Sequence, residues 1–224
     1  MLCRPADRLP GPAIRAQAVT HEESIHMMDL IKELQLSLDG QAPQLAALGP
    51  NSRTSRTAAV HDAIVARAAE YATSLGIGYG HDFKNRAPGD STLYVHRSGG
   101  KPLGQFLFDQ TWMLAHCTGD DGTEQFPISK KLKNGYVIEC VLAAESEWNN
   151  AASMCDDFLK LLVGKAKFKV FIYNSNEDQI MESMASLKAC IEGFRPGLRG
   201  ECLLISCFLE NLGRFHHDVC HDGM

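Results

Sequence analysis

The sequence is poor in the features that mark several large classes of protein. None of its apolar runs approaches the ~20 residues that a membrane-spanning helix needs, so we expect no membrane partner. The net charge of -5 does not give the basic surface of a strong, non-specific nucleic-acid binder. The sequence also contains no phosphate-binding glycine loop and no G-x-S-x-G elbow. A metal-dependent nuclease stays open, because a carboxylate metal site contributes acidic residues of its own.

Cysteine is present but never in close-set pairs. Several of the eight cysteines fall inside apolar runs, where a reduced cysteine behaves as a small hydrophobe. The first 20 residues have no apolar core of the signal-peptide type. We therefore expect a reducing, cytoplasmic environment. Residues 214–222 gather histidine, aspartate and cysteine, but without the paired spacing of a zinc site, so zinc is not expected there.

The hydrophobic fraction of 45% and the charged fraction of 22% are ordinary for a globular protein. Near the start, Thr20 and Glu23 fit a capping box, and Gly40 is a stop signal for the helix that follows. Residues 41–56 are rich in Pro, Gly, Ser and Asn and predict a linker. We therefore divide the chain into residues 1–56, a tail, helical arm and linker, and a main domain over residues 57–224. The arm could form a homodimer, act as a lid, or pack back on the core.

The main domain shows alternating helical and strand patterns, which predict an α/β fold with a mixed sheet. The expected helices and strands, in chain order, are helix 57–75, strands 92–97, 103–113 and 136–148, helix 150–163, strand 168–173, a helix ending near residue 194, and strand 202–209. The first three strands should form an antiparallel meander. The crossover through helix 150–163 should then give a parallel pair.

Carboxylates interrupt the apolar central strand at Glu139, Glu145 and Glu147. All three share parity, so in a regular strand they point to one face. A buried acid is costly unless it is paired or bound to a cation. A divalent metal would explain Glu145 and Glu147, and so would a position just past the core, in contact with water. Asp109 lies in the middle of the second strand, on the face opposite Phe108 and Trp112, where it could bind metal or guard a sheet edge.

Basic residues near these acids have two interpretations each. Lys160 could form a helix pair with Asp156 or serve the site. The cluster Lys130, Lys131 and Lys133 could be a solvated face or could meet phosphates. A different α/β enzyme that uses Cys117 beside His116 is a further alternative, but no third group completes such a site.

The order of elements, with Asp109 in the second strand and Glu145-Ser-Glu147 at the end of the third, resembles the PD-(D/E)XK nuclease superfamily, the restriction-endonuclease-like fold. The resemblance covers about residues 57–209. The run Ala144-Glu-Ser-Glu-Trp148 also looks like uncharacterised members of that superfamily. The resemblance implies an αβββαβ core, with an additional C-terminal helix and strand and the N-terminal helical arm.

The resemblance also implies site residues and a reaction. Asp109 matches the first acid and Glu145 the second, both as ligands of Mg²⁺ or Mn²⁺. Glu147 stands where most members have lysine, and Lys160 could supply the missing positive charge. Glu70 matches an accessory acid of some members. The implied activity is metal-dependent hydrolysis of DNA, with an inactive member that only binds protein or nucleic acid as the alternative.

Overall fold

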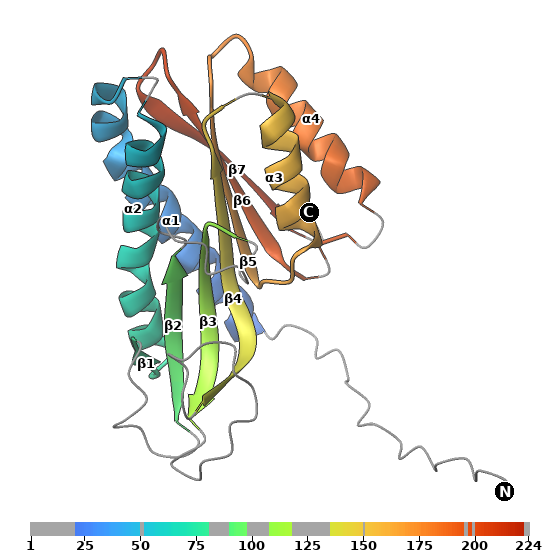
Figure 1. The fold of residues 1–224 in the computed structure, drawn as a ribbon. Helices are drawn as coiled ribbons and strands as arrows, with labels where there is room; N and C mark the ends of the chain where they lie inside the picture. Colours follow the sequence, from blue (N-terminus) through green and yellow to red (C-terminus); the bar gives the residue numbers. More distant parts are fainter. Residues whose placement is uncertain are drawn as a thin grey trace, which may run out of the picture.

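The computed structural model describes residues 21–49, 52–80, 90–97, 108–117, 135–149, 151–194, 197–198 and 200–221. These residues form a three-layer arrangement in which a mixed sheet lies between two pairs of helices (Figure 1). The helices are α1 (His21–Ala47), α2 (Arg53–Ser74), α3 (Ala151–Val163) and α4 (Ile180–Gly193). None of the helices in the described ranges is long and apolar enough to cross a membrane.

The strands follow the chain across the sheet, in the order β1 to β7. Their bounds are β1 (Gly78–Tyr79), β2 (Ser91–Arg97), β3 (Gln110–Cys117), β4 (Gly135–Glu147), β5 (Phe168–Ser175), β6 (Cys202–Leu209) and β7 (Arg214–His221). The antiparallel meander β2-β3-β4 and the parallel pair β4-β5 are confirmed. β6 is parallel to β5, and β7 returns antiparallel to β6. The carboxyl ends of β4, β5 and β6 therefore meet at one edge, next to the start of β3.

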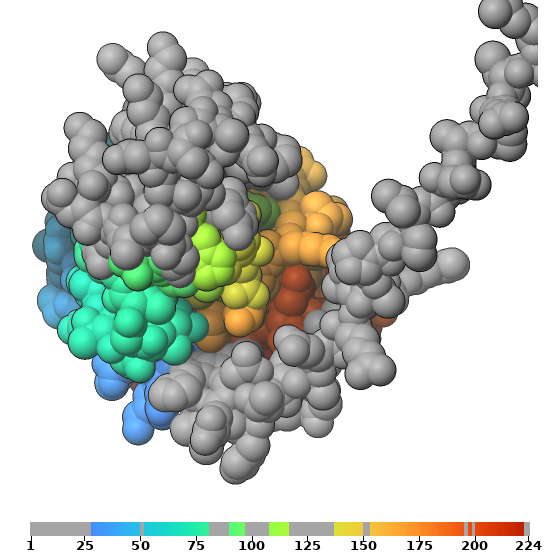
Figure 2. All heavy atoms as spheres, turned by 90° about the horizontal axis from the view of Figure 1, so that it is seen from below, coloured from blue at the N-terminus to red at the C-terminus, as the bar shows by residue number. Residues whose placement is uncertain are grey.

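Figure 2 views the opposite edge of the sheet, where the teal, green, yellow and orange parts of the chain adjoin in sequence order. Each face of the sheet carries its own apolar core. Val60, Ile64 and Ala68 of α2 pack with Leu142 and Leu204 on one face. On the other face, Phe158 and Leu162 of α3 pack with Leu187 of α4 and with Phe171 and Leu203. Because both faces are covered, the continuous apolar run of β6 is buried at every position.

The predicted end of the first helix at Gly40 is wrong. α1 continues through Gly40 and Pro43 to Ala47, although proline removes one backbone hydrogen bond from a helix interior. Tertiary packing offsets this cost, because Ala42 and Leu45 in the last turns are buried in the core. Residues 41–47 are thus helix instead of linker, and α1 packs back on the core, which is one of the alternatives that the sequence left open.

The predicted second strand is displaced toward the C-terminus. β3 begins at Gln110, so Asp109 lies just before the strand instead of in its middle, and His116 belongs to the strand instead of a polar loop. Phe108 and Trp112 do not share a face: Phe108 packs with the core on the α3 side, whereas Trp112 is buried on the α2 side. The expected alternation fails because the chain at residues 108–109 bends before β3 begins.

The prediction that Glu139 points to the same face as Glu145 and Glu147 is also wrong, because β4 is irregular. Its register with β3 shifts at two places, and the consecutive residues Val141 and Leu142 both pack into the core on the α2 side. Alternation therefore does not carry from Glu139 to Glu145. Glu139 instead pairs with Lys167 at 3.0 Å, far along the strand from Glu145.

Residues 214–221, where the sequence predicted no strand, form β7. Its Phe215 is buried in the core on the α1 side. His217 lies 2.9 Å from the hydroxyl of Ser206 and 3.2 Å from a carboxylate oxygen of Asp39 on α1. The histidine at this position thus connects β7 to β6 and α1.

Candidate active site

The antiparallel pairing of β3 and β4 brings Asp109 and Glu145 together. Gln110 pairs with Ala144, which places the residue before β3 beside the end of β4. The backbone N–H of Asp109 donates to Oε1 of Glu145 at 3.3 Å, and the backbone N–H of Ser146 donates to Oδ2 of Asp109 at 3.1 Å. The two acids are 36 residues apart in the chain. Each carboxylate accepts a hydrogen bond from a backbone N–H in the segment that carries the other acid.

Lys160 reaches the same place from α3. Its Nζ lies 2.8 Å from Oε1 of Glu145 and 3.0 Å from Oδ1 of Asp157. Within α3, Lys160 therefore pairs with Asp157, three residues before it, and not with Asp156 as predicted. Lys160 is 27% exposed, so its ammonium group lies at the border between the buried acid and solvent.

The surroundings of Glu145 disfavour the ionised form of its carboxyl group. Its side chain is buried, with 1% of the residue exposed. Burial and the nearby charge of Asp109 raise the pKa of Glu145 to about 8, although the hydrogen bond and charge of Lys160 oppose the rise. Burial alone would lower the pKa of Lys160, but Glu145 and Asp157 raise it overall, so this lysine keeps its proton. A further cation near Asp109 and Glu145 would relieve the repulsion between them.

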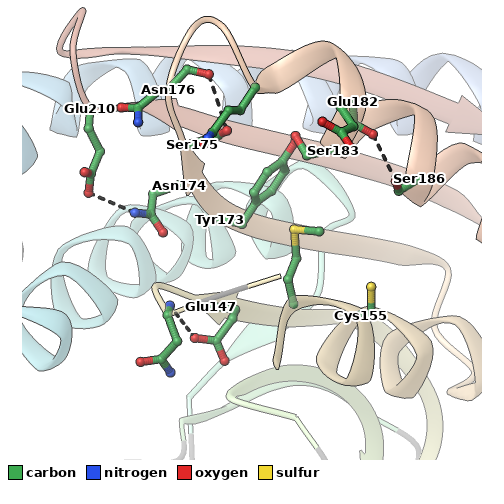
Figure 3. A pocket seen from close by; sticks show the side chains of 13 residues that line it. Glu147, Cys155, Tyr173, Asn174, Ser175, Asn176, Glu182, Ser183, Ser186 and Glu210 are labelled. Atoms are coloured by element: carbon green, nitrogen blue, oxygen red, sulfur yellow. Dashed lines mark hydrogen bonds between the residues drawn. The ribbon is translucent and has the colours of Figure 1, made fainter. Parts of the chain in front are cut away.

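Glu147 lies two residues beyond Glu145 and faces a different environment. Its Oε1 accepts a hydrogen bond from the backbone N–H of Asn149 at 2.6 Å. Burial raises the pKa of Glu147, and Asp157 raises it further, while Asn149 opposes the change. The carboxylate of Glu147 lines a cavity of about 440 Å³ between α3 and α4, which is shown in Figure 3. Asp157 therefore contacts both Lys160 and Glu147 and links the surroundings of Glu145 and Glu147.

A set of hydroxyl and ring groups surrounds Asp109 on the α2 side, and sequence reasoning missed it. The hydroxyl of Ser146 lies 3.3 Å both from Oδ2 of Asp109 and from Oγ1 of Thr57, which also accepts from Nε1 of Trp148 at 3.1 Å. Nε2 of the buried His61 lies 3.9 Å from Oδ2 of Asp109. Thr57 and His61 are four residues apart and share one face of α2. In the sequence, the one signal of this set was His61, a histidine beside the apolar stripe of α2.

The remaining predicted residues do not join this group. Glu70 is exposed and pairs with Arg67 at 2.6 Å. It lies nine residues after His61 on α2, which corresponds to about 13 Å along the axis and roughly half a turn away from the site face. Glu70 therefore lies away from Asp109 and Glu145, and this placement gives no support to its predicted role as an accessory acid. Lys130, Lys131 and Lys133 lie outside the described residues.

No protein-family model matches the chain. Comparison with curated proteins and with solved structures likewise found no match. The resemblance to the PD-(D/E)XK superfamily therefore stays a prediction from the sequence, based on the order of elements and on Asp109 and Glu145-Ser-Glu147.

The described residues contain no group of three or more His, Cys, Asp or Glu side chains arranged to hold a metal ion. Two carboxylates nevertheless fit Mg²⁺, which usually keeps several waters and binds one or two protein carboxylates together with substrate phosphate. The donor set at Asp109 and Glu145 consists of hard carboxylate oxygens. Burial raises the pKa of Glu145, and the charge of Asp109 raises it further, so a cation at this pair would favour the ionised carboxyl. These residues fit a weakly held Mg²⁺ or Mn²⁺ ion and do not form a closed structural site.

Proposed function

We propose that the chain is a metal-dependent nuclease of PD-(D/E)XK type that hydrolyses phosphodiester bonds in DNA. The observation that carries the proposal is the meeting of Asp109, Glu145 and Lys160 at the junction of β3, β4 and α3. Support also comes from the succession α2-β1-β2-β3-β4-α3-β5, which, apart from the two-residue strand β1, follows the αβββαβ order of that superfamily. Lys160 takes the place of the lysine that the E-x-E sequence lacks, but it comes from the helix instead of the strand.

In this proposal, Asp109 and Glu145 hold Mg²⁺ or Mn²⁺. When bound, such an ion polarises the phosphate and lowers the pKa of a coordinated water. The hydrogen bonds from Ser146 orient Asp109, so the carboxylate is held in place before substrate arrives.

Lys160 acts as a fixed positive charge. Two of its three N–H donors are directed to Glu145 and Asp157, and the third is available for an oxygen of the phosphate that is attacked. Because its pKa is raised, Lys160 stabilises charge and does not accept a proton. Glu147 has the complementary property, since burial raises the pKa of its carboxyl, which makes it a stronger base than an exposed glutamate, and we assign it to orient and deprotonate the attacking water.

DNA is the proposed substrate and partner, and the basic cluster of Lys130, Lys131 and Lys133 is proposed to contact its phosphates. A homodimer through α1 stays a proposal of lower rank. The apolar stripe of that helix is already buried within the chain, although Leu36 is exposed on its outer side.

One observation favours a second candidate, a protein of the same fold that binds but does not cleave. The contact between Lys160 and Glu145 at 2.8 Å gives the buried acid a partner without any metal. If this ion pair is the final state of the site, the chain binds protein or nucleic acid only.

The deciding experiment is a cleavage assay on plasmid, linear duplex and single-stranded DNA with Mg²⁺ and with Mn²⁺. We expect cleavage by the wild type and a loss of roughly 100-fold or more in Glu145→Gln, Asp109→Asn and Lys160→Met. The matched controls are Glu139→Gln, on the same strand but paired with Lys167, and Lys165→Met, an exposed lysine after α3. Cleavage that survives Glu145→Gln would refute the assignment. Absence of wild-type cleavage with both metals would favour the binding protein.

A further inference from the structure

The cavity beside Glu147 has the size and place of a ligand site. Its volume of about 440 Å³ lies within the range of roughly 300–1,000 Å³ that is usual for small-molecule pockets. It opens at the carboxyl ends of β4 and β5, between the N-terminal halves of α3 and α4 (Figure 3). Carboxyl ends of parallel strands are the usual place for ligands in α/β sheets. The reaction described above uses only Glu147 from this lining, so most of the cavity has no assigned role.

The polar groups of the cavity exclude some ligands. Among the described residues that line it, none is Lys, Arg or His, so no side chain there would neutralise a phosphate or a carboxylate. The polar lining consists of amides, hydroxyls and carboxylates, including Asn174, Asn176, Ser183 and Glu147. Figure 3 shows Glu147 on one side of the cavity, with Asn174 and Ser183 on the side of β5 and α4. The three carboxylates of the lining, Glu147, Glu182 and Glu210, therefore disfavour an anionic ligand and favour one that carries N–H donors.

The remaining surface of the cavity is less polar and suits a flat ligand. Met154 and Cys155 of α3 and the ring of Tyr173 contribute to the lining. The amide nitrogen of Asn174 already donates to Oε1 of Glu210 at 2.8 Å, so Asn174 offers its oxygen as an acceptor. The amide of Asn176 offers a donor and an acceptor side by side, which is the pattern that matches adenine, and glutamate accepts from the amino group of cytosine. A nucleobase with an exocyclic amino group combines the flat shape with the required donors.

The cavity adjoins the proposed cleavage site. Glu147 lines it and lies two residues after Glu145 on β4. Asp157 influences Glu147 and also binds the ammonium group of Lys160 at 3.0 Å. A phosphate held at Lys160 would therefore have its own base within reach of the cavity.

We propose that this cavity is a nucleobase subsite, which takes an unpaired adenine, cytosine or guanine from the nucleotide whose phosphate lies at Lys160. The inference rests on the proposed function and names its substrate as single-stranded or locally unpaired DNA. A base inside a duplex would first have to leave the stack, at a cost of a few kcal/mol, which an unpaired base avoids. Thymine, which has no exocyclic amino group, is the base that fits this acceptor-rich lining least well.

The test uses the thiol of Cys155 as a reporter in the full-length protein. Alkylation of each cysteine is followed by peptide mass spectrometry, with and without deoxyadenosine, deoxycytidine, deoxyguanosine or thymidine. We expect the three amino-bearing deoxynucleosides to slow alkylation of Cys155 and thymidine to have the smallest effect. Cys190 on α4 does not line the cavity and should react at an unchanged rate.

Two variants test the recognition without touching the cleavage residues. Asn174→Leu and Gln179→Leu each remove one lining amide, and each should weaken protection of Cys155 roughly tenfold, as expected for the loss of a base-edge contact. The matched control is Asn211→Leu, which removes an amide of the neighbouring turn that binds the backbone of Glu177 outside the cavity. Thermal melting identifies a variant that does not fold. If one of the two lining variants fails to fold, protection of Cys155 in the other tests the subsite.

The outcomes separate this inference from the proposed function. If no deoxynucleoside protects Cys155, or if thymidine protects as well as the others, the subsite is refuted even when metal-dependent cleavage is intact. If protection follows the expected order but no DNA is cleaved, the subsite stands and the nuclease activity fails. Protection by a simple diamine in place of the nucleosides would also overturn the subsite, because the cavity would then select positive charge.

Discussion

Replacing Glu145 by glutamine keeps the size of the side chain and removes its ability to ionise. The structure places this acid in a buried position, beside Asp109 and in contact with Lys160. If the metal-free protein tolerates the negative charge poorly, the substitution should stabilise the fold at high pH. The effect should be small at low pH, where the acid is neutral in any case.

The magnitude follows from the pKa of Glu145, which burial and the charge of Asp109 raise from 4.5 to about 8. As pH rises through this window, the unfolded chain releases the proton while the folded chain keeps it. The unfolded state then binds fewer protons than the folded state, so wild-type stability falls with rising pH. Between pH 5 and pH 8.5 the loss is about 4 kcal/mol, or roughly 8–16 °C in melting temperature for a chain of this size.

The assay is urea unfolding of the wild type and Glu145→Gln at pH 5 and pH 8.5, in the presence of a chelator. The quantity compared is the change with pH in the stability difference between the two proteins, which cancels the titration of groups that do not interact with Glu145. Glu139→Gln provides the control, because that acid is partly exposed and paired with Lys167. A stability difference that is equal at both pH values would show that ionisation of Glu145 does not lower the stability of the fold. The buried carboxylate of Glu145 would then need no cation beside it.

Three further predictions follow from the same geometry. Mg²⁺ should bind about tenfold more weakly for each pH unit below 8 and release close to one proton from Glu145 at pH 7, which calorimetry in two buffers of different ionisation enthalpy measures. Gly164→Ala should lower both stability and DNA cleavage, because an added Cβ would clash with the ring of Phe108 next to Asp109; chemical denaturation and the cleavage assay check this, and unchanged values would refute the contact. Arg56→Met should cost about 1.5–3 kcal/mol, because it removes the charge-assisted hydrogen bond between the buried guanidinium and the partly exposed Glu210, and thermal unfolding gives the value.

Some elements of the fold were predictable from local sequence because their pattern and their environment agree. The apolar run of β6 predicts a strand with both faces covered, and the strand has the predicted bounds. β7 was missed for the opposite reason: its polar residues, such as His217, resemble a ligand cluster, whereas their partners Ser206 and Asp39 lie far away in the chain. The end of α1 could not be predicted either, since packing of Leu45 outweighs the local signals of Gly40 and Pro43.

For the candidate site, the residue types were accessible from sequence and the arrangement was only partly so. Asp109 and Glu145 stood out because carboxylates are rare inside apolar runs. The contact of Lys160 with Asp157 instead of Asp156 depends on how α3 rotates against the sheet, which spacing alone does not fix. The approach of Thr57 to Ser146 joins residues 89 positions apart, and no local pattern announces such a contact.

The packing of α1 against β7 has a consequence for how the chain reaches its native state. Asp39 meets His217 across a separation of 178 residues, and Leu34 and Leu38 of α1 share one core with Phe215. Although α2 covers part of α1, the apolar surface of α1 that packs against β7 stays uncovered until residues around 215 have been synthesised. Such distant pairings close slowly and leave the intermediate prone to self-association. If folding of the chain depends on a chaperone, we expect the chaperone to bind α1.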